Sequence, residues 1–169
     1  MNAAVYSRRF DKEALAIKTN LWKMLIYVFI QRFVKTSDII LDIGGGTGEF
    51  INNVSGSKKY LVDINPECRN AIKLDVEYLC SNVVNGIDLV AEAVNVVFAR
   101  NFFEHLDSAE SLLKVLDEAR RVLKHDGRII IIQPNIKYAY KEYWDFIDHK
   151  LPVSDKSLVE ALELSGFKL

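Results

Sequence analysis

The sequence predicts an α/β fold in which a mostly parallel sheet carries helices on both faces. Short β-branched runs alternate with longer amphipathic patterns, which is typical of parallel sheets with helical crossovers. Four of the eight glycines lie within residues 44–48, directly after the first apolar run, where a strand would turn into a ligand-binding loop. A chain of 169 residues, half of them hydrophobic, has the size of one globular domain with a core of its own.

The first half of the chain is expected to contain two helices and two strands. Apolar residues recur at helical spacing over roughly 11–35, which predicts a long amphipathic helix. Residues 39–43 form a short apolar run that ends at the glycines, as a buried parallel strand would. Residues 49–54 indicate a short helix ended by Gly56, and residues 60–62 a second strand. The apolar face of the first helix comprises Leu15, Trp22, Leu25, Ile26, Phe29 and Phe33.

The second half repeats this alternation. Asp107 and Glu110 have the spacing of a capping box at the start of a helix, and Gly127 is expected to end that helix. Four isoleucines at 129–132 indicate the most apolar strand of the chain. The expected elements are, in order, a strand at 94–99, a helix from Asp107 to Gly127, a strand at 128–133 and a helix from Ser157 to Gly166.

The charge balance gives no reason to expect a nucleic-acid partner. The net charge is −1 and the pI is near 6.3, so the whole molecule does not attract polyanions. Residues 1–35 nevertheless carry a net charge of +5, against −6 for the rest of the chain. The basic segment is either the solvated face of a helix or a site that attracts an anionic substrate.

The cysteines and the apolar runs indicate a cytoplasmic protein without a metal site or a membrane span. Cys68 and Cys80 lack both C-x-x-C spacing and a histidine at zinc spacing, so we expect reduced thiols. The longest apolar run, residues 24–30, is far shorter than the roughly 20 residues that a membrane-spanning helix needs. The amino terminus lacks the apolar stretch of a signal peptide.

The glycine-rich loop does not fit the two common phosphate-binding patterns. A nucleoside triphosphate loop needs a Gly-Lys pair starting five residues after its first glycine, but Glu49 stands there. A dinucleotide fingerprint needs Gly-x-Gly-x-x-Gly, and both registers fail at the third glycine. Asp42 and Glu49 also flank the loop with carboxylates, which suit a cationic ligand better than a pyrophosphate.

Four segments resemble the motifs of class I S-adenosylmethionine-dependent methyltransferases. Residues 41–50, Leu-Asp-Ile-Gly-Gly-Gly-Thr-Gly-Glu-Phe, are similar to the first motif of that family. Residues 60–66 resemble its second strand, whose terminal acid binds the ribose of the cofactor. Residues 96–106 and 119–128 resemble its fourth strand and the helix, turn and fifth strand that follow. The motifs occur in the family's order, and the resemblance covers roughly 38–169.

The resemblance implies a Rossmann-like fold and a single domain over residues 1–169. Residues 1–36 would be an amino-terminal helical segment, residues 37–135 the cofactor-binding core, and residues 136–169 an acceptor-side loop and the last helix. The family's sheet ends in an antiparallel hairpin, whereas this sequence ends where the next strand would begin. We therefore expect the hairpin to be missing and the chain to be truncated. The open strand edge would need a cover, such as a second copy in a homodimer or the missing residues.

The resemblance also implies how S-adenosylmethionine would be held, with S-adenosylhomocysteine as the product. The glycines would let the backbone pass close to the methionyl and ribose groups. Asp42 would receive the ammonium group directly or through water, and Asp63, 21 residues later, would bind the ribose hydroxyls. A plain tight turn is the alternative for the glycines. The implied cofactor-binding residues are Asp42, Gly44, Gly45, Gly46, Gly48, Asp63, Ile64, Asp75, Val76, Arg100 and Asn101.

The place of the third strand is open. Asp75 resembles the acid that accepts the adenine amino group, which puts the third strand just before it; an exposed loop acid is the alternative. Only residues 64–70 would then connect the second and third strands, whereas a parallel crossover usually takes about a dozen residues or more. Either the second helix has shrunk to a turn or the third strand lies elsewhere.

The methyl acceptor is expected beyond the strand ends, in the aromatic segment 138–150. Methyl transfer is an in-line displacement, for which alignment and exclusion of water supply much of the rate and a base is optional. His149 is the preferred catalytic base, although the segment could equally be a lid packed on the domain, and His105 could simply fix a loop. The candidate bases are Glu104, His105, Tyr143, Asp145, Asp148 and His149.

The segment 135–167 resembles methyltransferases of small metabolites, including some that act in the synthesis of sugar derivatives. The sequence lacks the Asn/Asp-Pro-Pro-aromatic and Pro-Cys motifs of common nucleic-acid methyltransferases. A small-molecule methyltransferase is therefore the expected function. A cofactor-binding homologue without catalysis, or a partner subunit, is the alternative, and a nicotinamide-dependent oxidoreductase is a third option that the glycine registers disfavour.

Overall fold

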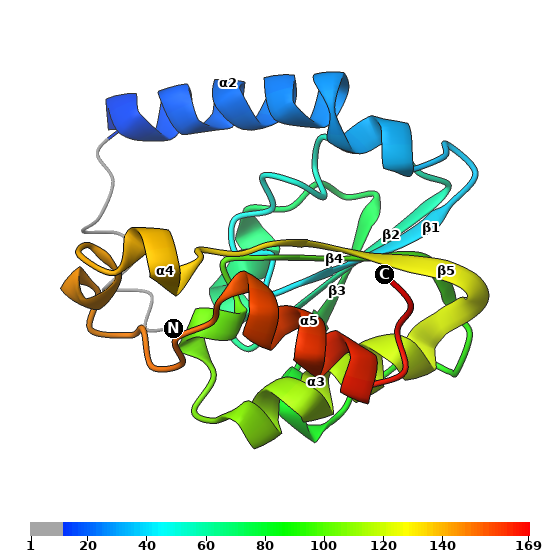
Figure 1. The fold of residues 1–169 in the computed structure, drawn as a ribbon. Coiled ribbons are helices and arrows are strands. Elements are labelled where there is room, and N and C mark those ends of the chain that lie inside the picture. Colours follow the sequence, from blue (N-terminus) through cyan, green and yellow to red (C-terminus); the bar gives the residue numbers. More distant parts are fainter. Residues whose placement is uncertain (1–11) are drawn as a thin grey trace.

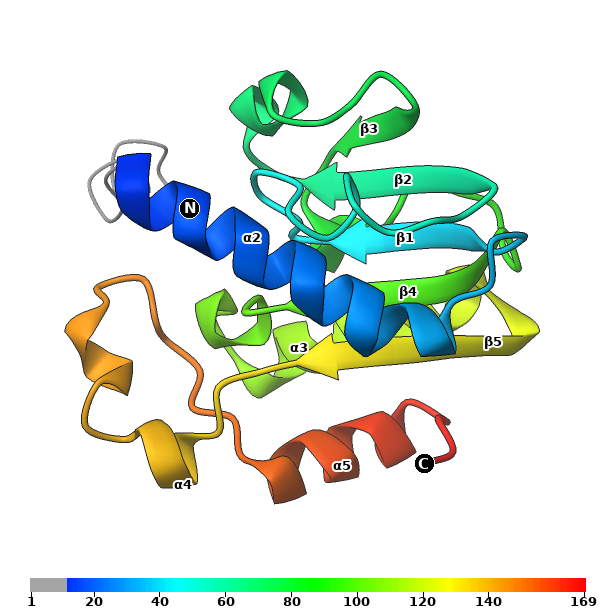
Figure 2. The same cartoon turned by 90° about the horizontal axis from the view of Figure 1, so that it is seen from above.

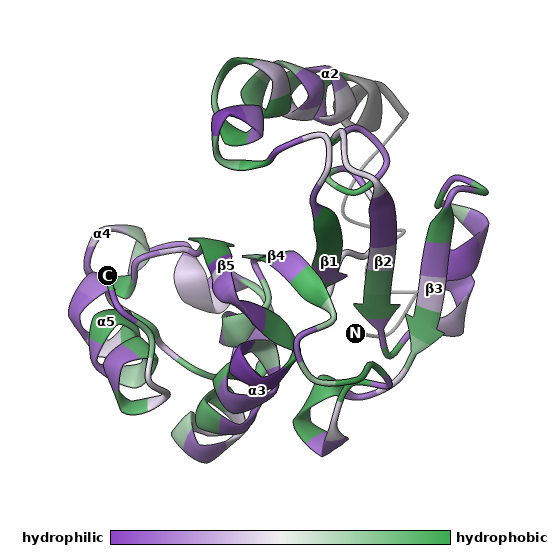
Figure 3. Ribbon diagram, turned by 90° about the vertical axis from the view of Figure 1, so that its right-hand side faces the viewer, coloured by the Kyte–Doolittle hydropathy of each residue, from purple (hydrophilic) through white to green (hydrophobic). Residues whose placement is uncertain are grey.

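The chain folds around one five-stranded parallel sheet with the strand order β3-β2-β1-β4-β5. The computed structural model describes residues 12–169, and the side chains of residues 17–169. Seen end on, α2 covers one face of the sheet, and α3 and α5 lie on the other side (Figures 1 and 3). The strands are β1 (Ile39–Ile43), β2 (Lys58–Asp63), β3 (Val76–Cys80), β4 (Val94–Arg100) and β5 (Leu123–Ile132). The helices are α2 (Lys12–Val28), α3 (Ala109–Val122), α4 (Ile136–Ala139) and α5 (Asp155–Leu164), with 3-10 turns η1 (Ile30–Phe33), η2 (Pro66–Asn70), η3 (Val83–Asn85), η4 (Phe103–His105) and η5 (Tyr143–Asp145).

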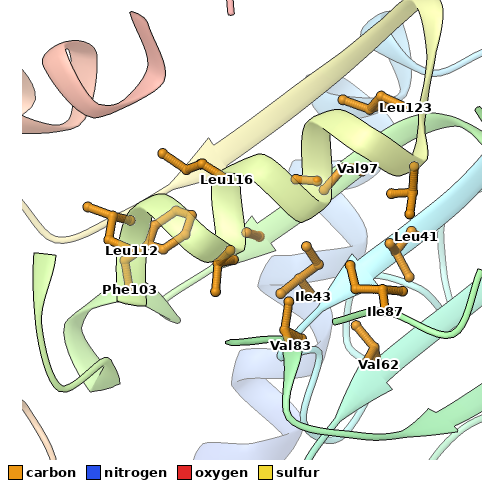
Figure 4. Packing of buried hydrophobic residues seen from close by; sticks show 14 of the residues in the cluster. Leu41, Ile43, Val62, Val83, Ile87, Val97, Phe103, Leu112, Leu116 and Leu123 are labelled. Carbon is orange, nitrogen blue, oxygen red and sulfur yellow. The ribbon is translucent and has the colours of Figure 1, made fainter. Parts of the chain in front are cut away.

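The predicted α/β class with a parallel sheet is confirmed, and its central strands are apolar because both faces are covered. Leu41 and Ile43 of β1 point into the cluster formed with α3, whereas Ile40 belongs to the cluster under α2. Figure 4 shows the α3 side, where Leu112 and Leu116 meet side chains of β1 and β4. Each fully buried Leu or Ile contributes about 1.5–3 kcal/mol of hydrophobic stabilisation. These two clusters hold the strand ends at fixed positions.

The amino-terminal helix differs from the prediction in its buried face. The α-helix ends at Val28, and the chain continues as the tighter η1. Trp22 packs against the buried cluster under α2, whereas Phe29 and Phe33 are exposed. A 3-10 turn has three residues per turn, so the buried side rotates relative to the 3.6-residue pattern. The side chain of Leu15, which was predicted for the apolar face, lies outside the described residues.

Several predicted boundaries are wrong for local reasons. Residues 49–54 form turns instead of a helix. The amino-terminal cap of α3 is Ser108, whose hydroxyl accepts from the amide of Ser111, while Asp107 pairs with Lys150. α3 passes directly into β5 at Leu123, so Gly127 does not end the helix.

The crossover between β2 and β3 explains the open placement of the third strand. The second helix has indeed shrunk to η2, and the third strand also lies later than Asp75, at Val76–Cys80. Asn65 caps η2 by accepting from the amide of Glu67.

The last helix, α5, begins earlier than predicted. Its capping box pairs Ser154 with Ser157, so the helix starts at Asp155 and not at Ser157.

The edge of the sheet at β5 carries no further strand among the described residues. Helix α5 runs alongside β5 on its outer side (Figure 2), and Ala161 and Leu162 join the α3 cluster. Within residues 12–169, no helix combines the length and the apolar character that crossing a membrane would require.

Candidate functional site

Two adjoining cavities lie at the carboxyl ends of β1, β2 and β4, where the strand order reverses direction. Ligands of open parallel sheets bind at such a switch point. Gly44, Asn101 and His105 line both cavities. The first cavity, of about 280 Å³, extends toward β2 and β3, and we call it the nucleoside pocket. The second, of about 300 Å³, extends toward α4 and the segment after it, and we call it the acceptor pocket.

The glycine loop, residues 44–48 after β1, requires glycine where its backbone has a positive φ or is closely packed. Gly44, Gly46 and Gly48 have φ angles of +65°, +53° and +75°, a region that residues with a Cβ rarely adopt. A Cβ on Gly44 would overlap the ring of Phe102, and one on Gly45 would fall 2.5 Å from Asp42 Oδ2. A Cβ on Gly46 would meet no heavy atom within 4 Å. The backbone at Gly46 therefore borders open space in the acceptor pocket.

Asp63, at the end of β2, holds the loop and faces the nucleoside pocket. Its Oδ2 accepts from the amide of Gly46 at 3.1 Å, and its Oδ1 accepts from the amide of Asn65 at 2.9 Å. Each carboxylate oxygen has a second lone-pair site, so both can still accept from hydroxyl groups of a ligand. The predicted neighbour Ile64 also lines this pocket. The arrangement suits a ribose diol.

Asp42 lies beneath the loop and lines neither cavity. It is buried, and burial raises its pKa well above the ordinary value, although the nearby Arg100 opposes this shift. The carboxylate occupies the space beside Gly45, so these two residues support the loop from inside. Gly48 is also packed inside, since a Cβ there would approach Asn52 and Ile72. A contact between Asp42 and a ligand ammonium group, directly or through water, stays a prediction, and Asp42 itself lines neither cavity.

A chain of charges ties α2 to the glycine loop. Lys18 Nζ lies 2.7 Å from one oxygen of Glu49, and Arg100 lies 3.5 Å from the other. Burial alone would raise the pKa of Glu49, but the bond to Lys18 and the charge of Arg100 outweigh burial and lower it. The Arg100 guanidinium stacks 4.3 Å above the ring of Trp22. Lys18 and Arg100 both line the acceptor pocket, where they present cations to an anionic ligand group.

Asn101 follows Arg100 at the end of β4 and has a φ of +46°. Its amide donates to the carbonyl of Ile132, which fixes this turn against β5. Asn101 lines both cavities, and Arg100 lines the acceptor pocket. The structure thus brings these two predicted residues together with Gly44, Gly46 and Asp63.

The structure does not bring Asp75 and Val76 to this site. Asp75 precedes β3 and therefore lies at the opposite, amino-terminal edge of the sheet, where it is exposed and pairs with Lys59 at 2.6 Å. The placement as adenine-binding residues fails because β3 begins at Val76 instead of ending before Asp75. Asn82 and Val83 stand after the end of β3 and line the nucleoside pocket. The five-residue run 76–80 directly precedes Ser81 and Asn82. If this run is taken as the third strand, the sequence places these two residues at its carboxyl end.

The segment after β5 forms one wall of the acceptor pocket. Figure 2 shows α4 and the chain after it beyond the carboxyl end of β5. Tyr143, Phe146 and His149 from this segment line the pocket together with Glu104 and His105 from η4. Of the other candidate bases, Asp148 contacts His105 at 3.4 Å without lining a cavity, and Asp145 is exposed.

Three rings surround His149, and its surroundings favour the neutral form of the imidazole. The ring centroids of His105, Tyr143 and Phe146 lie 4.9–5.1 Å from that of His149. Burial lowers the pKa of His149, and the charge of His105 adds to this, while the charge of Glu104 opposes it. Its Nδ1 is buried without a hydrogen-bond partner among the described residues.

Backbone contacts fix the His149 loop against η4. The carbonyl of Glu104 accepts from the amides of Lys150 and Leu151, at 2.7 and 3.1 Å. The hydroxyl of Tyr143 donates to the carbonyl of Leu151. Burial raises the pKa of this phenol to about 12, so Tyr143 stays a donor at neutral pH. The pocket wall is therefore held by main-chain bonds.

The fold and the site together define a domain of the S-adenosylmethionine-dependent methyltransferase class. A parallel sheet with this strand order, a positive-φ glycine loop after β1 and a carboxylate at the end of β2 are its defining features. Residues 41–131 match the family model described as "Methyltransferase domain", which is more than half of the chain. The chain belongs to this family, and S-adenosylmethionine is the cofactor of the domain.

Proteins that are similar in sequence or in structure are consistent with this family. An uncharacterized protein of Methanocaldococcus jannaschii is 30% identical over 148 residues, which cover 85% of this chain and 61% of the relative. The chain thus spans about three fifths of the length of that relative. A crystal structure of an S-adenosylmethionine-dependent methyltransferase from Archaeoglobus fulgidus has a TM-score of 0.76 and 26% identity, and the match covers 89% of this chain and 69% of that one. Haemonchus contortus phosphoethanolamine N-methyltransferase 1, solved with phosphoethanolamine and S-adenosylhomocysteine, has a TM-score of 0.58 and 21% identity, over 75% of this chain and 29% of that one.

The residues present fit the cofactor. The open space over Gly46 and the free lone pairs of Asp63 match a close backbone approach and a ribose diol. Lys18 and Arg100 offer positive charge for a methionyl carboxylate, and Asn82 offers an amide at the far end of the nucleoside pocket. The two cavities meet at Gly44 and Asn101, where the sulfonium between the nucleoside and the methionyl part would lie.

Proposed function

We propose that this chain transfers a methyl group from S-adenosylmethionine to a small-molecule acceptor. The single observation that carries the proposal is the pair of cavities that share Gly44 and Asn101 as a common wall. One cavity has the donor-binding features, and the other is lined in part by the chain's own segment after β5. A volume of about 300 Å³ lies at the lower end of the range for small-molecule sites.

In this proposal the cofactor, when bound, supplies an electrophilic methyl group on a sulfonium. Asp63 binds the ribose hydroxyls through charge-assisted hydrogen bonds, and Asn82 binds the adenine edge. The glycine loop brings backbone amides close to the methionyl part, and Lys18 with Arg100 balances its carboxylate. The loop is already fixed by the Gly46–Asp63 bond, so little ordering is needed on binding.

The acceptor half aligns the nucleophile and excludes water. Tyr143 and Phe146 give the pocket an apolar wall, and Glu104 is fully buried behind it. We propose His149 as the general base, because its unpartnered Nδ1 is buried in the wall of this pocket. The rate would come chiefly from alignment of the acceptor atom with the methyl group, and proton removal would add to it.

The acceptor is proposed only as a class. The pocket carries cations at Lys18 and Arg100 and carboxylates at Glu104 and Glu142, which suits a small polar molecule. Among proteins of the same fold, the Haemonchus contortus enzyme was solved with phosphoethanolamine, which is a molecule of this kind. A sugar derivative stays a prediction of the sequence resemblance.

The test is methyl transfer from labelled S-adenosylmethionine to a fractionated cell extract, with Asp63→Ala as the inactive control. Label in the small-molecule fraction that disappears in the control supports the proposal. Label only in protein or nucleic acid overturns the acceptor class. Binding of S-adenosylhomocysteine without transfer to any fraction favours the alternative, a cofactor-binding homologue without catalysis or a partner subunit.

The predicted homodimer has a candidate surface on α2. Four apolar side chains recur at helical spacing and are each more than half exposed. A second copy of the chain would cover them, as an apolar helix stripe usually requires a partner. Sedimentation of the chain and of a variant with two of these residues changed to Glu tests this. The four residues are Ile17, Leu21, Met24 and Val28.

A further inference from the structure

One group of side chains in the acceptor pocket has the composition of a metal site. Glu104, His105 and His149 each offer one ligand atom, and these atoms all lie within 4.8 Å of one another. Glu104 and His105 belong to η4 after β4, whereas His149 comes from the segment after α4. The residues are therefore brought together by the fold and not by local sequence.

Two of the three ligand groups each contain a buried atom that lacks a hydrogen-bond partner among the described residues. Glu104 is fully buried, and its Oε1 has no hydrogen-bond partner among the described residues. Within the same residues, Glu104 forms no salt bridge with any Lys or Arg. His149 Nδ1 is also buried and unpartnered. A buried carboxylate and a buried ring nitrogen are costly unless a cation or donor satisfies them.

The remaining polar atoms of Glu104 and His105 are held in the way that supports metal ligands. Gln133 Nε2 donates to Glu104 Oε2 at 2.8 Å, which leaves Oε1 as the carboxylate oxygen without a partner among the described residues. The Nδ1 of His105 lies 3.0 Å from the carbonyl of Asp148. A carbonyl can only accept, so Nδ1 is the donor of this bond and Nε2 is the ring nitrogen that remains for a metal ion. Metal-binding histidines almost always donate their other N–H to a carbonyl or carboxylate in this manner.

We propose that Glu104, His105 and His149 bind a divalent transition-metal ion of the zinc type, with one coordination position open to the acceptor pocket. Two imidazoles and one carboxylate are a known ligand set of catalytic zinc sites, which keep their fourth position for water or substrate. Ligand atoms around tetrahedral zinc are about 3.3 Å apart, as bond lengths of about 2.0–2.1 Å require. Ion binding therefore requires the three ligand atoms, which lie within 4.8 Å of one another without the ion, to come closer together. Mg²⁺ prefers oxygen ligands and does not suit this set.

The role of the ion rests on the proposed function, but its binding does not. A metal ion and a proton compete for the same nitrogen of His149, so the metal-loaded chain cannot use His149 as a base. The ion would instead hold an acceptor hydroxyl, amine or thiol in its open position and lower the pKa of that group. A chelator therefore lowers transfer if the ion acts, and leaves it unchanged if His149 acts alone.

The test is calorimetric titration of the full chain with Zn²⁺, without cofactor, and Co²⁺ absorption as a report of the ligand set. We expect one ion per chain, and His149→Ala should bind it at least about 100-fold more weakly. Glu104→Gln, which keeps the shape of the buried side chain, should weaken binding as well. His125→Ala is the matched control, because His125 is the remaining histidine of the chain, is exposed and lies outside the cluster.

The outcomes separate the two proposals. Loss of Zn²⁺ binding in His149→Ala but not in His125→Ala supports the site. No stoichiometric binding to a folded chain, or equal binding by both variants, overturns it. Zn²⁺ binding without methyl transfer would leave the metal site standing and count against the proposed function. Transfer by a chain that binds no Zn²⁺ would do the reverse.

Discussion

The two halves of the site are built by different means. The cofactor half, from Gly44 to Asp63, consists of main-chain turns and one carboxylate that bonds to them, all within β1, β2 and their connection. The acceptor half depends on side chains such as Glu104 and His149, which are far apart in sequence and lie on 3-10 turns and loop. The cofactor half is therefore rigid and local, whereas the acceptor half is assembled by tertiary contacts. Changes in one half should leave the other working.

The largest expected effect is on the loop. Gly46→Ala places a methyl group in the open space over the loop at a positive φ, so we expect cofactor affinity to fall at least about 100-fold. The backbone strain costs about 1–2 kcal/mol, which lowers the melting temperature by about 2–8 °C. Calorimetric titration with S-adenosylhomocysteine and thermal melts measure the two effects.

Gly166→Ala is the matched control for the loop. Gly166 also has a positive φ, of +78°, and open space around its Cβ position, but it lies after α5. It should share the loss of stability and keep cofactor affinity. Equal loss of affinity in both variants would contradict a specific role of the loop.

The next largest effect is expected from a change in the acceptor half. His149→Ala should lower the rate of methyl transfer about 10²–10⁴-fold, in the range of lost acid–base catalysis. The affinity for S-adenosylhomocysteine should stay within about 2-fold, because His149 does not line the nucleoside pocket. Single-turnover rates and titrations check this. A parallel loss of cofactor affinity would show that the two halves are coupled.

A smaller effect decides whether Asn82 or Asp75 binds the adenine. Asn82→Ala should lower cofactor affinity about 10-fold, which corresponds to one or two neutral hydrogen bonds. Asp75→Ala should leave it unchanged, because Asp75 is exposed at the opposite edge of the sheet. Titration of both variants gives the answer. The reverse order of effects would restore Asp75 and contradict the position of β3.

The smallest expected effect concerns the tie between α2 and the loop. The pKa of Glu49 is below its ordinary value of 4.5, so its ion pair with Lys18 stabilises the fold above that pH, and the stabilisation is lost as the pH falls through the lowered pKa. Lys18→Ala should cost about 1 kcal/mol at pH 7 and less near pH 3. Denaturant unfolding at both pH values measures it. Lys23→Ala, an exposed lysine of the same helix, is the control and should show neither effect.

The same contrast explains how much the sequence could predict. Asp63 and the glycines of the loop were predictable, because the chemistry there depends on a few residues next to each other. Asp75 was misplaced because the crossover shrank to η2, and the length of a connection is set by packing that no local pattern records. The support of Gly45 by Asp42 is likewise visible only in three dimensions.

The acceptor half was harder to predict for a physical reason. A run of aromatic residues points to His149, but nothing in the sequence joins it to Glu104. The amides of Lys150 and Leu151 donate to the carbonyl of Glu104 and bring the two residues together. Nothing in the sequence indicates a metal site either, because its ligands lie on separate segments. In the sequence, Lys18 is one of several basic residues in a predicted helix. Its ion pair with Glu49 is visible only in the fold.

The central claim, that Asp63 and the loop bind S-adenosylmethionine in the nucleoside pocket, has one direct test. It is calorimetric titration of S-adenosylhomocysteine into the wild-type chain and into Asp63→Ala, with a thermal melt to show that both are folded. Asp63→Ala removes two charge-assisted bonds to the ribose, worth about 1.5–3 kcal/mol each. We expect binding by the wild type and affinity at least about 100-fold weaker in the variant. A folded wild-type chain that binds no S-adenosylhomocysteine, or a variant that binds it equally well, would contradict the claim.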